Sequence, residues 1–245
     1  MYLLLSGEGV GDIGGKNNAA EFMAGPMAVM VDHLLGRLQG YEFSYLDLNN
    51  ESVEYVSETE LTQGAQELKA HRKSPSLPGR KNRSETLYYR RNARVFAIRA
   101  KEKAAECNDQ VVAVLFRDAD GTASAGRGDW QAKWDSMLAG FDDEGFSYGV
   151  PMIPKPKSEA WLLCALSKDY QHCDALESES GNDNAPHSLK TQLARVLAGE
   201  VSAQGIADRV REHNIDVCRI DMPSFNQFKC RLTDVVRSIV GRGPA

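Results

Sequence analysis

The chain has 245 residues, 42% of them hydrophobic, and a formal net charge of −5. This length allows one large domain, or one domain with an extension, around a sizeable core. No apolar run approaches the roughly 18 residues of a membrane span, and no basic stretch precedes the apolar start, so we expect a cytoplasmic protein without a signal peptide. The five cysteines form no CxxC pair, which favours free thiols over a disulfide framework or structural zinc.

The first part of the chain predicts alternating strands and helices. Residues 2–6 form a short apolar strand, and the glycine-rich stretch GEGVGDIGGKNN predicts a loop after it. Residues 22–40 predict a helix with a proline near its start and a glycine at its end. The alternation in YEFSYLDL predicts a second strand over 41–48, and residues 71–83 have the composition of an exposed loop.

The middle of the chain continues this alternation. Residues 84–106 predict an amphipathic helix that buries Tyr88, Val95 and Ile98 and turns basic residues to its other faces. The later elements are a strand over 110–117, a helix over 129–141, a strand over 146–154, a helix over 158–169, a polar loop over 174–188, and helices over 189–199, 203–213 and 223–239. This order predicts an α/β fold with a mostly parallel sheet flanked by helices. We expect that domain over residues 1–170, with a helical C-terminal part over 171–245 packed on it.

Acidic residues follow the predicted strands at their carboxyl ends, where open parallel sheets gather ligands. Glu8 and Asp12 come after the first strand, Asp118 and Asp120 after the central one, and Glu159 opens a later helix. Asp-Gly is also a common turn pair, so the two aspartates could simply cap a turn. A cluster of carboxylates needs a cation to offset its repulsion, and oxygen ligands favour Mg²⁺ or Mn²⁺. Pairs of such ions serve phosphodiester hydrolysis.

A strand ending in Glu within a glycine turn, followed by a later strand ending in Asp-x-Asp, resembles the TOPRIM domain of topoisomerases, primases and OLD-family nucleases. The matching residues are Glu8 and Asp12 in LLSGEGVGD, and Asp118 and Asp120 in LFRDADGT. The stretches PMIPKPKSEAWLL, APHSLKTQL and MPSFNQFKCRL resemble one TOPRIM-like branch, several members of which are encoded beside ATPases in phage-defence operons.

The resemblance covers most of the chain and implies a TOPRIM-like sheet and a metal-dependent nuclease that acts on DNA or RNA in antiviral defence, with an ATPase as partner. It implies that Glu8, Asp118 and Asp120 hold a divalent ion, with Asp12 and Glu159 helping to hold a second. TOPRIM nucleases also place a lysine near the scissile phosphate. No motif identifies that lysine here; Lys190 is our first candidate and Lys157 the next.

One segment is strongly basic. From Lys69 to Lys103 the chain carries twelve basic and two acidic residues, a net charge of +10, which leaves −15 for the rest. Such a segment can be an ordinary solvated surface, but its arginines and tyrosines could also grip phosphates and stack on bases. The residues that we expect to contact nucleic acid are Arg80, Lys81, Arg83, Arg90, Arg91 and Arg94.

Two other functions stay open. The DADGT stretch also resembles the first motif of haloacid-dehalogenase-type phosphatases, in which Asp118 would be a nucleophile and Asp120 an acid/base, although Glu8 has no role in that scheme. Alternatively, the protein is a non-catalytic sensor or effector subunit whose metal site is structural and whose basic segment binds nucleic acid or an ATPase. A GxGxxG match from Gly9 to Gly14 lacks the context of a dinucleotide site.

Overall fold

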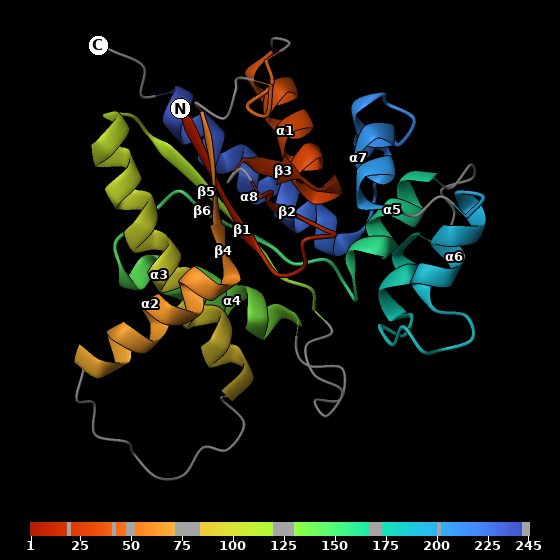
Figure 1. Ribbon diagram of the computed structural model, residues 1–245, viewed down its shortest axis with the longest axis horizontal. Helices are drawn as coiled ribbons and strands as arrows, with labels where there is room; N and C mark the ends of the chain where they lie inside the picture. The colour runs from red at the N-terminus through yellow and green to blue at the C-terminus, as the bar shows by residue number, and fades with distance from the viewer. Residues whose placement is uncertain are drawn as a thin grey trace.

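The computed structural model describes residues 1–18, 21–40, 43–47, 52–71, 84–119, 130–166, 173–199 and 202–241. Within these ranges, the main sheet contains the parallel strands β1 (Tyr2–Gly7), β4 (Val53–Ser57), β5 (Val111–Phe116) and β6 (Gly149–Met152), in the order β4-β1-β5-β6 (Figure 1). A small antiparallel pair joins β2 (Gly14–Lys16) to β3 (Phe22–Ala24). The predicted α/β class with a parallel sheet is therefore confirmed.

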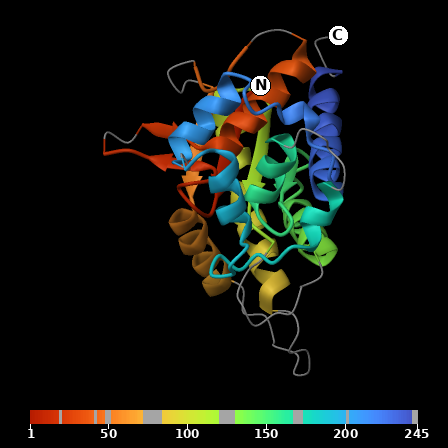
Figure 2. The same cartoon turned by 90° about the vertical axis from the view of Figure 1, so that its right-hand side faces the viewer.

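Helices flank the sheet. One side carries α2 (Glu58–His71), α3 (Ser84–Cys107) and α4 (Trp130–Asp143), and the other carries α1 (Pro26–Gln39) and α8 (Pro223–Val240) (Figure 1). Beside them lie α5 (Ser158–Leu166), η2 (Cys173–Ser178), α6 (Leu189–Val196), α7 (Ala203–Arg211) and η3 (Val217–Arg219); α5 and α6 pack together and face the viewer in Figure 2. In the described part of the chain, no helix is long and apolar enough to cross a membrane.

The core is centred on β5. All six of its residues are buried because β1 and β6 pair with it on both sides and helices cover both faces, which explains the continuous apolar run VVAVLF. The same core extends into the C-terminal helices, where the Trp161 ring lies 5.1 Å from that of Phe225 and 5.7 Å from that of Phe228. Trp161 also donates its indole N–H to Ser224 Oγ at 2.9 Å. Sheet and C-terminal helices thus share one core.

The path of the chain creates a switch point in the sheet. From β1 the chain moves to β4 on one side, and it then crosses back to β5 on the other side of β1. The carboxyl ends of β1 and β5 are neighbours in register, with Gly7 opposite Phe116. Such a point is where open parallel sheets bind ligands, because the connections leave in opposite directions there.

The strand predicted over 41–48 is wrong for its described part, 43–47, which forms no strand. Side chains satisfy the backbone there: Asp32 accepts the N–H of Tyr45 at 2.7 Å, and Ser44 Oγ accepts those of Leu46 and Asp47 at 3.2 Å. Local side-chain acceptors of this kind compete with a strand ladder. The second strand of the sheet is instead β4.

The glycine-rich stretch is more ordered than a simple loop. Within it, β2 pairs with β3, and α1 therefore begins at Pro26 rather than at residue 22. A Cβ on Gly14 would lie 2.2 Å from the carbonyl oxygen of Met23, and Gly14 has φ +105°, so only glycine fits this close pairing. The close approach of the β2 and β3 backbones determines this hairpin. Hydrophobic periodicity, which reports only on side chains, could not predict it.

The predicted helix at 84–106 is confirmed as α3, but its expected buried face is displaced. The buried stripe consists of Tyr89, Ala93, Phe96, Ala97 and Ala100. Val95 and Ile98 are only half-buried. The displacement arises because α3 is packed between α2 and α4 as well as against the sheet, so more than one of its faces is covered.

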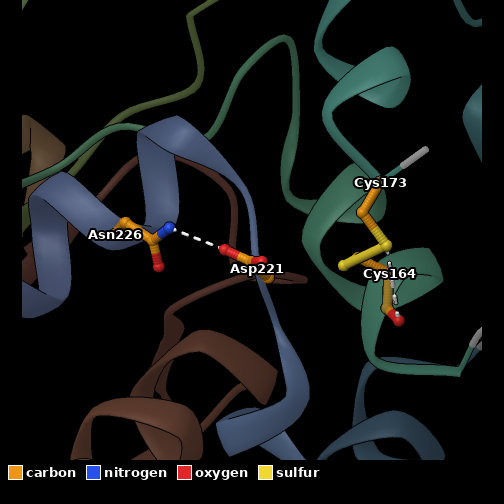
Figure 3. Close-up of a disulfide and its surroundings, with 4 residues drawn as sticks. All are labelled: Cys164, Cys173, Asp221 and Asn226. Atoms are coloured by element: carbon orange, nitrogen blue, oxygen red, sulfur yellow. Dashed lines mark hydrogen bonds between the residues drawn. A yellow bond between two sulfur atoms is a disulfide. The ribbon is translucent and has the colours of Figure 1, made fainter. Parts of the chain in front are cut away.

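Two of the five cysteines form a disulfide, which corrects the expectation of free thiols. Cys164 in α5 and Cys173 at the start of η2 have Cα atoms 5.4 Å apart (Figure 3). Figure 3 also shows the 2.9 Å hydrogen bond from Asn226 to Asp221 near the start of α8. The spacing of nine residues carries no disulfide motif, and the fold brings the two thiols together.

Close packing of α3 against α4 gives a test of the fold. A Cβ on Gly140 would lie 2.4 Å from the carbonyl oxygen of Arg90 and 2.7 Å from the Cβ of Ala93. We expect Gly140→Ala to lower the free energy of unfolding by about 1–3 kcal/mol, because the helices must move apart. Urea denaturation measures this change. Gly11→Ala, whose Cβ would meet nothing within 4 Å, is the control and should show no comparable loss.

The histidine pair between α1 and the loop after α7 predicts a pH dependence of stability. The His33 and His213 rings lie 4.6 Å apart. Burial, then the charges of His213 and Arg37, lower the pKa of His33 below 6.5, and Asp216 opposes them. The unfolded chain therefore binds a proton more readily, so this contribution to stability is present above pH 6.5 and is lost as the pH falls toward the folded-state pKa.

Thermal unfolding between pH 8 and pH 5 checks this expectation. His33→Gln should lose less stability on acidification than the parent protein does. His187→Gln, which alters an exposed histidine in the loop before α6, should follow the parent curve. Parallel curves for all three proteins would contradict the assignment to His33.

Candidate functional site

The site is built on the contact between Glu8 and Asp118, which follow β1 and β5. The backbone N–H of Asp118 donates to Glu8 Oε1 at 2.8 Å. Gly7, just before Glu8, makes this approach possible, because a Cβ there would lie 2.7 Å from Ile13 Cγ2 and 3.1 Å from Phe116 Cβ. The two predicted acids are therefore brought together at the switch point of the sheet.

Ser158 ties the other acids to this pair. Its backbone N–H donates to Asp118 Oδ1 at 3.2 Å, and its hydroxyl donates to Asp12 Oδ1. Because Ser158 is the first residue of α5, the positive end of the helix dipole faces the carboxylate of Asp118. Ser158 is not among the site residues predicted from the sequence. Its place at the start of the helix that follows β6, beside Glu159, is the signal that could have marked it as a site residue.

Glu159 lies at the same helix start. Its carboxyl group lies 3.5 Å from Ser158 Oγ, within reach of that hydroxyl. Burial raises the pKa of Glu159, and the charge of Asp12 raises it further, while Lys157 acts in the opposite direction. A carboxyl group that keeps its proton to a higher pH than usual is suited to proton transfer.

Arg117, the residue before Asp118, is a buried cation. Its side chain is 0% exposed, and Nη1 donates to the carbonyl oxygen of Phe116 at 2.7 Å. In the described part of the chain, Nε and Nη2 have no hydrogen-bond partner. The guanidinium carbon lies 5.7 Å from the centre of the Tyr88 ring. Burying an arginine without full pairing costs stability, so the sheet carries an unfavourable charge next to the site.

The two predicted lysines differ in how they relate to the acidic residues. Lys157 donates to Asp183 at 3.0 Å, although its charge still acts on Glu159. Lys190 is exposed near the start of α6, and none of its described contacts joins it to Glu8 or Asp118. Four other predicted site residues lie outside the described residues: Asp120, Arg80, Lys81 and Arg83.

Two arginines of α3, Arg90 and Arg94, are engaged with acids at the end of α4. Arg90 forms two hydrogen bonds of 2.7 Å with the carboxylate of Asp143. Arg94 donates to Glu144 at 2.6 Å. Arg91 is half-buried, and in the described ranges it has no ion pair. Part of the predicted basic surface thus serves to hold α3 to α4.

The donors at the site suit an oxygen-preferring divalent ion in type, since they are carboxylates with one serine hydroxyl. Among the described residues alone, however, no group of three or more His, Cys, Asp or Glu is close enough to hold a metal ion. A ligand set built on Glu8 and Asp118 would need further donors, and the expected ligand Asp120 lies outside the described residues. Glu8 and Asp118 fit such a set because their contact keeps both carboxylates at one edge of the sheet.

A separate hollow of about 750 Å³ lies along the later part of α1. Its lining includes Asp32, His33, Arg37, Phe43 and His213. None of the four described site carboxylates lines it. This hollow is therefore distinct from the acidic site.

The incompletely paired buried charge of Arg117 leads to a prediction about stability. Arg117→Met should raise the free energy of unfolding by about 1–4 kcal/mol, because an apolar side chain of similar length removes an incompletely paired buried charge. Arg231→Met is the matched control, since Arg231 donates to the carbonyl oxygens of Gly149 at 3.0 Å and Ser147 at 2.8 Å. We expect that control to be destabilised. Urea denaturation compares the two variants, and an equal loss in both would contradict this account of Arg117.

Comparisons with models of protein families, with curated proteins and with solved structures found no match to this chain. The resemblance to TOPRIM domains therefore rests on the motifs that contain Glu8, Asp118 and Asp120. What the site does is argued below from its residues.

Proposed function

We propose that the protein is a divalent-metal-dependent nuclease that hydrolyses phosphodiester bonds of DNA or RNA. The observation that supports this proposal is the contact between Glu8 and Asp118 at the switch point of a parallel sheet, with Ser158 linking Asp118 to Asp12. The charge of Asp12 raises the pKa of Glu159, so negative charges in this site repel one another, and a bound cation would offset that repulsion.

In this proposal Glu8, Asp118 and Asp120 hold a Mg²⁺ or Mn²⁺ ion, and Asp12 and Glu159 help with a second. When bound, such an ion neutralises negative charge on the phosphate group and in its transition state. Ser158 fixes the orientation of the carboxylates through its N–H and hydroxyl groups. Lys157 is the better-supported candidate for the additional lysine, because its charge acts on Glu159. Lys190 is the second candidate.

The substrate backbone would be held by the basic segment without recognition of its sequence. Arg90 and Arg94 are paired with acids at the end of α4. We therefore expect the substrate to contact mainly Arg91 and three residues of the preceding segment, Arg80, Lys81 and Arg83. A role in antiviral defence and an ATPase partner are further parts of the proposal, and both rest on the resemblance alone.

A non-catalytic effector subunit is the second candidate function. The finding that favours it is that no three metal-binding side chains cluster within the described ranges. In that case Glu8 and Asp118 would serve structure or partner binding, and the protein would cut no nucleic acid with any divalent ion.

Cleavage assays test the nuclease. Purified protein is incubated with supercoiled, linear and single-stranded DNA and with RNA, in the presence of Mg²⁺, Mn²⁺ or EDTA. We expect cleavage that needs the metal, and a loss of at least about 100-fold in Glu8→Gln and in Asp118→Asn, because each removes a negative charge that would hold the metal ion, and the ion's positive charge would stabilise the transition state. Nucleic-acid binding, measured in Ca²⁺, should persist in both variants.

Asp135→Asn is the matched control. Asp135 is an exposed acid of α4 whose described hydrogen bond is with Gln131, so the variant should cut like the parent. If the parent protein cuts none of the substrates with either metal, the autonomous nuclease proposal fails. Cleavage that survives in Asp118→Asn would also overturn it.

A further inference from the structure

The backbone of Asp118 and Ala119 lies outside any strand or helix, and other residues supply its hydrogen-bond partners. The N–H of Asp118 donates to Glu8 at 2.8 Å, and its carbonyl oxygen accepts from the hydroxyl of Tyr89 at 2.9 Å. The N–H of Ala119 lies 3.2 Å from the carbonyl oxygens of Pro154 and Pro156. The carbonyl oxygen of Ala119 accepts from the ammonium group of Lys133. All four backbone polar groups of these two residues are thus satisfied.

Two of these partners are side chains from helices that contribute no acid to the site. Tyr89 belongs to α3 and is 3% exposed, and Lys133 belongs to α4 and is 2% exposed. The Lys133 ammonium also lies 5.7 Å from the centre of the Tyr89 ring. The helices α3 and α4, which carry these two side chains, pack closely against each other at Gly140. The two donors therefore lie beside each other next to the Asp118–Ala119 backbone.

The burial of Lys133 calls for a reason. Lysine is among the residue types least often buried, because its ammonium loses hydration in the interior. Lys101 of α3 makes a similar contact, with the carbonyl oxygen of Glu144 at 2.9 Å, but remains exposed. Binding a carbonyl oxygen thus does not by itself require a buried lysine. The acceptor of Lys133 is the carbonyl oxygen of the residue next to Asp118.

We propose that Tyr89 and Lys133 are positioning residues for Asp118. By holding the carbonyl groups on either side of the peptide bond after Asp118, they fix the backbone from which its carboxylate projects. This inference rests on the proposed function in that Asp118 is taken to bind the divalent ion. Precise placement of a ligand by residues around it is worth about 10–100-fold in metal affinity.

The experiment measures two properties of the full-length parent protein and of Tyr89→Phe, Lys133→Met and Lys101→Met. The first is the affinity for Mn²⁺ alone, from the electron paramagnetic resonance signal of the free ion. The second is the hydrogen-exchange rate of the Asp118 and Ala119 amides, measured by NMR without metal. Thermal unfolding identifies any variant that fails to fold. Tyr89→Phe keeps the ring and removes only the hydroxyl, so it carries the test if Lys133→Met does not fold.

We expect Tyr89→Phe and Lys133→Met to bind Mn²⁺ about 10–100-fold more weakly and to exchange the two amides faster. Lys101→Met should match the parent protein in both. Parent-like affinity and exchange in the Tyr89 and Lys133 variants would overturn the inference and leave the nuclease proposal intact. If the parent binds no Mn²⁺, the proposed function fails, and exchange alone then decides: faster exchange supports the positioning role, and unchanged exchange overturns it.

Discussion

The hydrogen bond from the Asp118 backbone to the carboxylate of Glu8 is the interaction on which the site depends. It joins residues 110 positions apart in the chain, and it forms only because β1 and β5 are adjacent and in register. Gly7 and the buried run of β5 allow the two strands to end at the same level. Asp12, Ser158 and Glu159 then gather around this pair, because the connections after β1 and β6 meet at the same edge.

The surroundings of this bond differ from the rest of the interior. Elsewhere the core is almost entirely apolar, but beside Asp118 it contains two buried cations, Arg117 and Lys133, and Glu159 is a largely buried acid with a raised pKa. Each of these groups opposes the stability that hydrophobic burial supplies. Polar groups kept at such a cost, and gathered at one strand end, are what a functional site would require.

The basic helix shows how composition can mislead about a surface. The charge of the 69–103 segment suggested a surface for phosphates, yet Arg90 and Arg94 are directed at Asp143 and Glu144. Asp143 ends α4 and Glu144 follows it, far along the chain from α3, so no local pattern could reveal the pairing. The same contact brings Tyr89 and Lys133 behind Asp118, which links the packing of α3 on α4 to the geometry of the acidic site.

Hydrophobic periodicity and acidic residues at strand ends were enough to predict the parallel α/β fold, most helices, and the meeting of Glu8 with Asp118, because these depend on local pattern and on the rule for parallel sheets. Tertiary structure alone decided the other features. These are the absence of a strand at 43–47, the β2–β3 hairpin, the Cys164–Cys173 disulfide, and the roles of Ser158, Tyr89 and Lys133. Each depends on contacts between elements whose spacing in the sequence does not indicate that they meet. Hydrogen bonds to side-chain acceptors, close approach of two backbones and packing of helices arise only once the chain is folded.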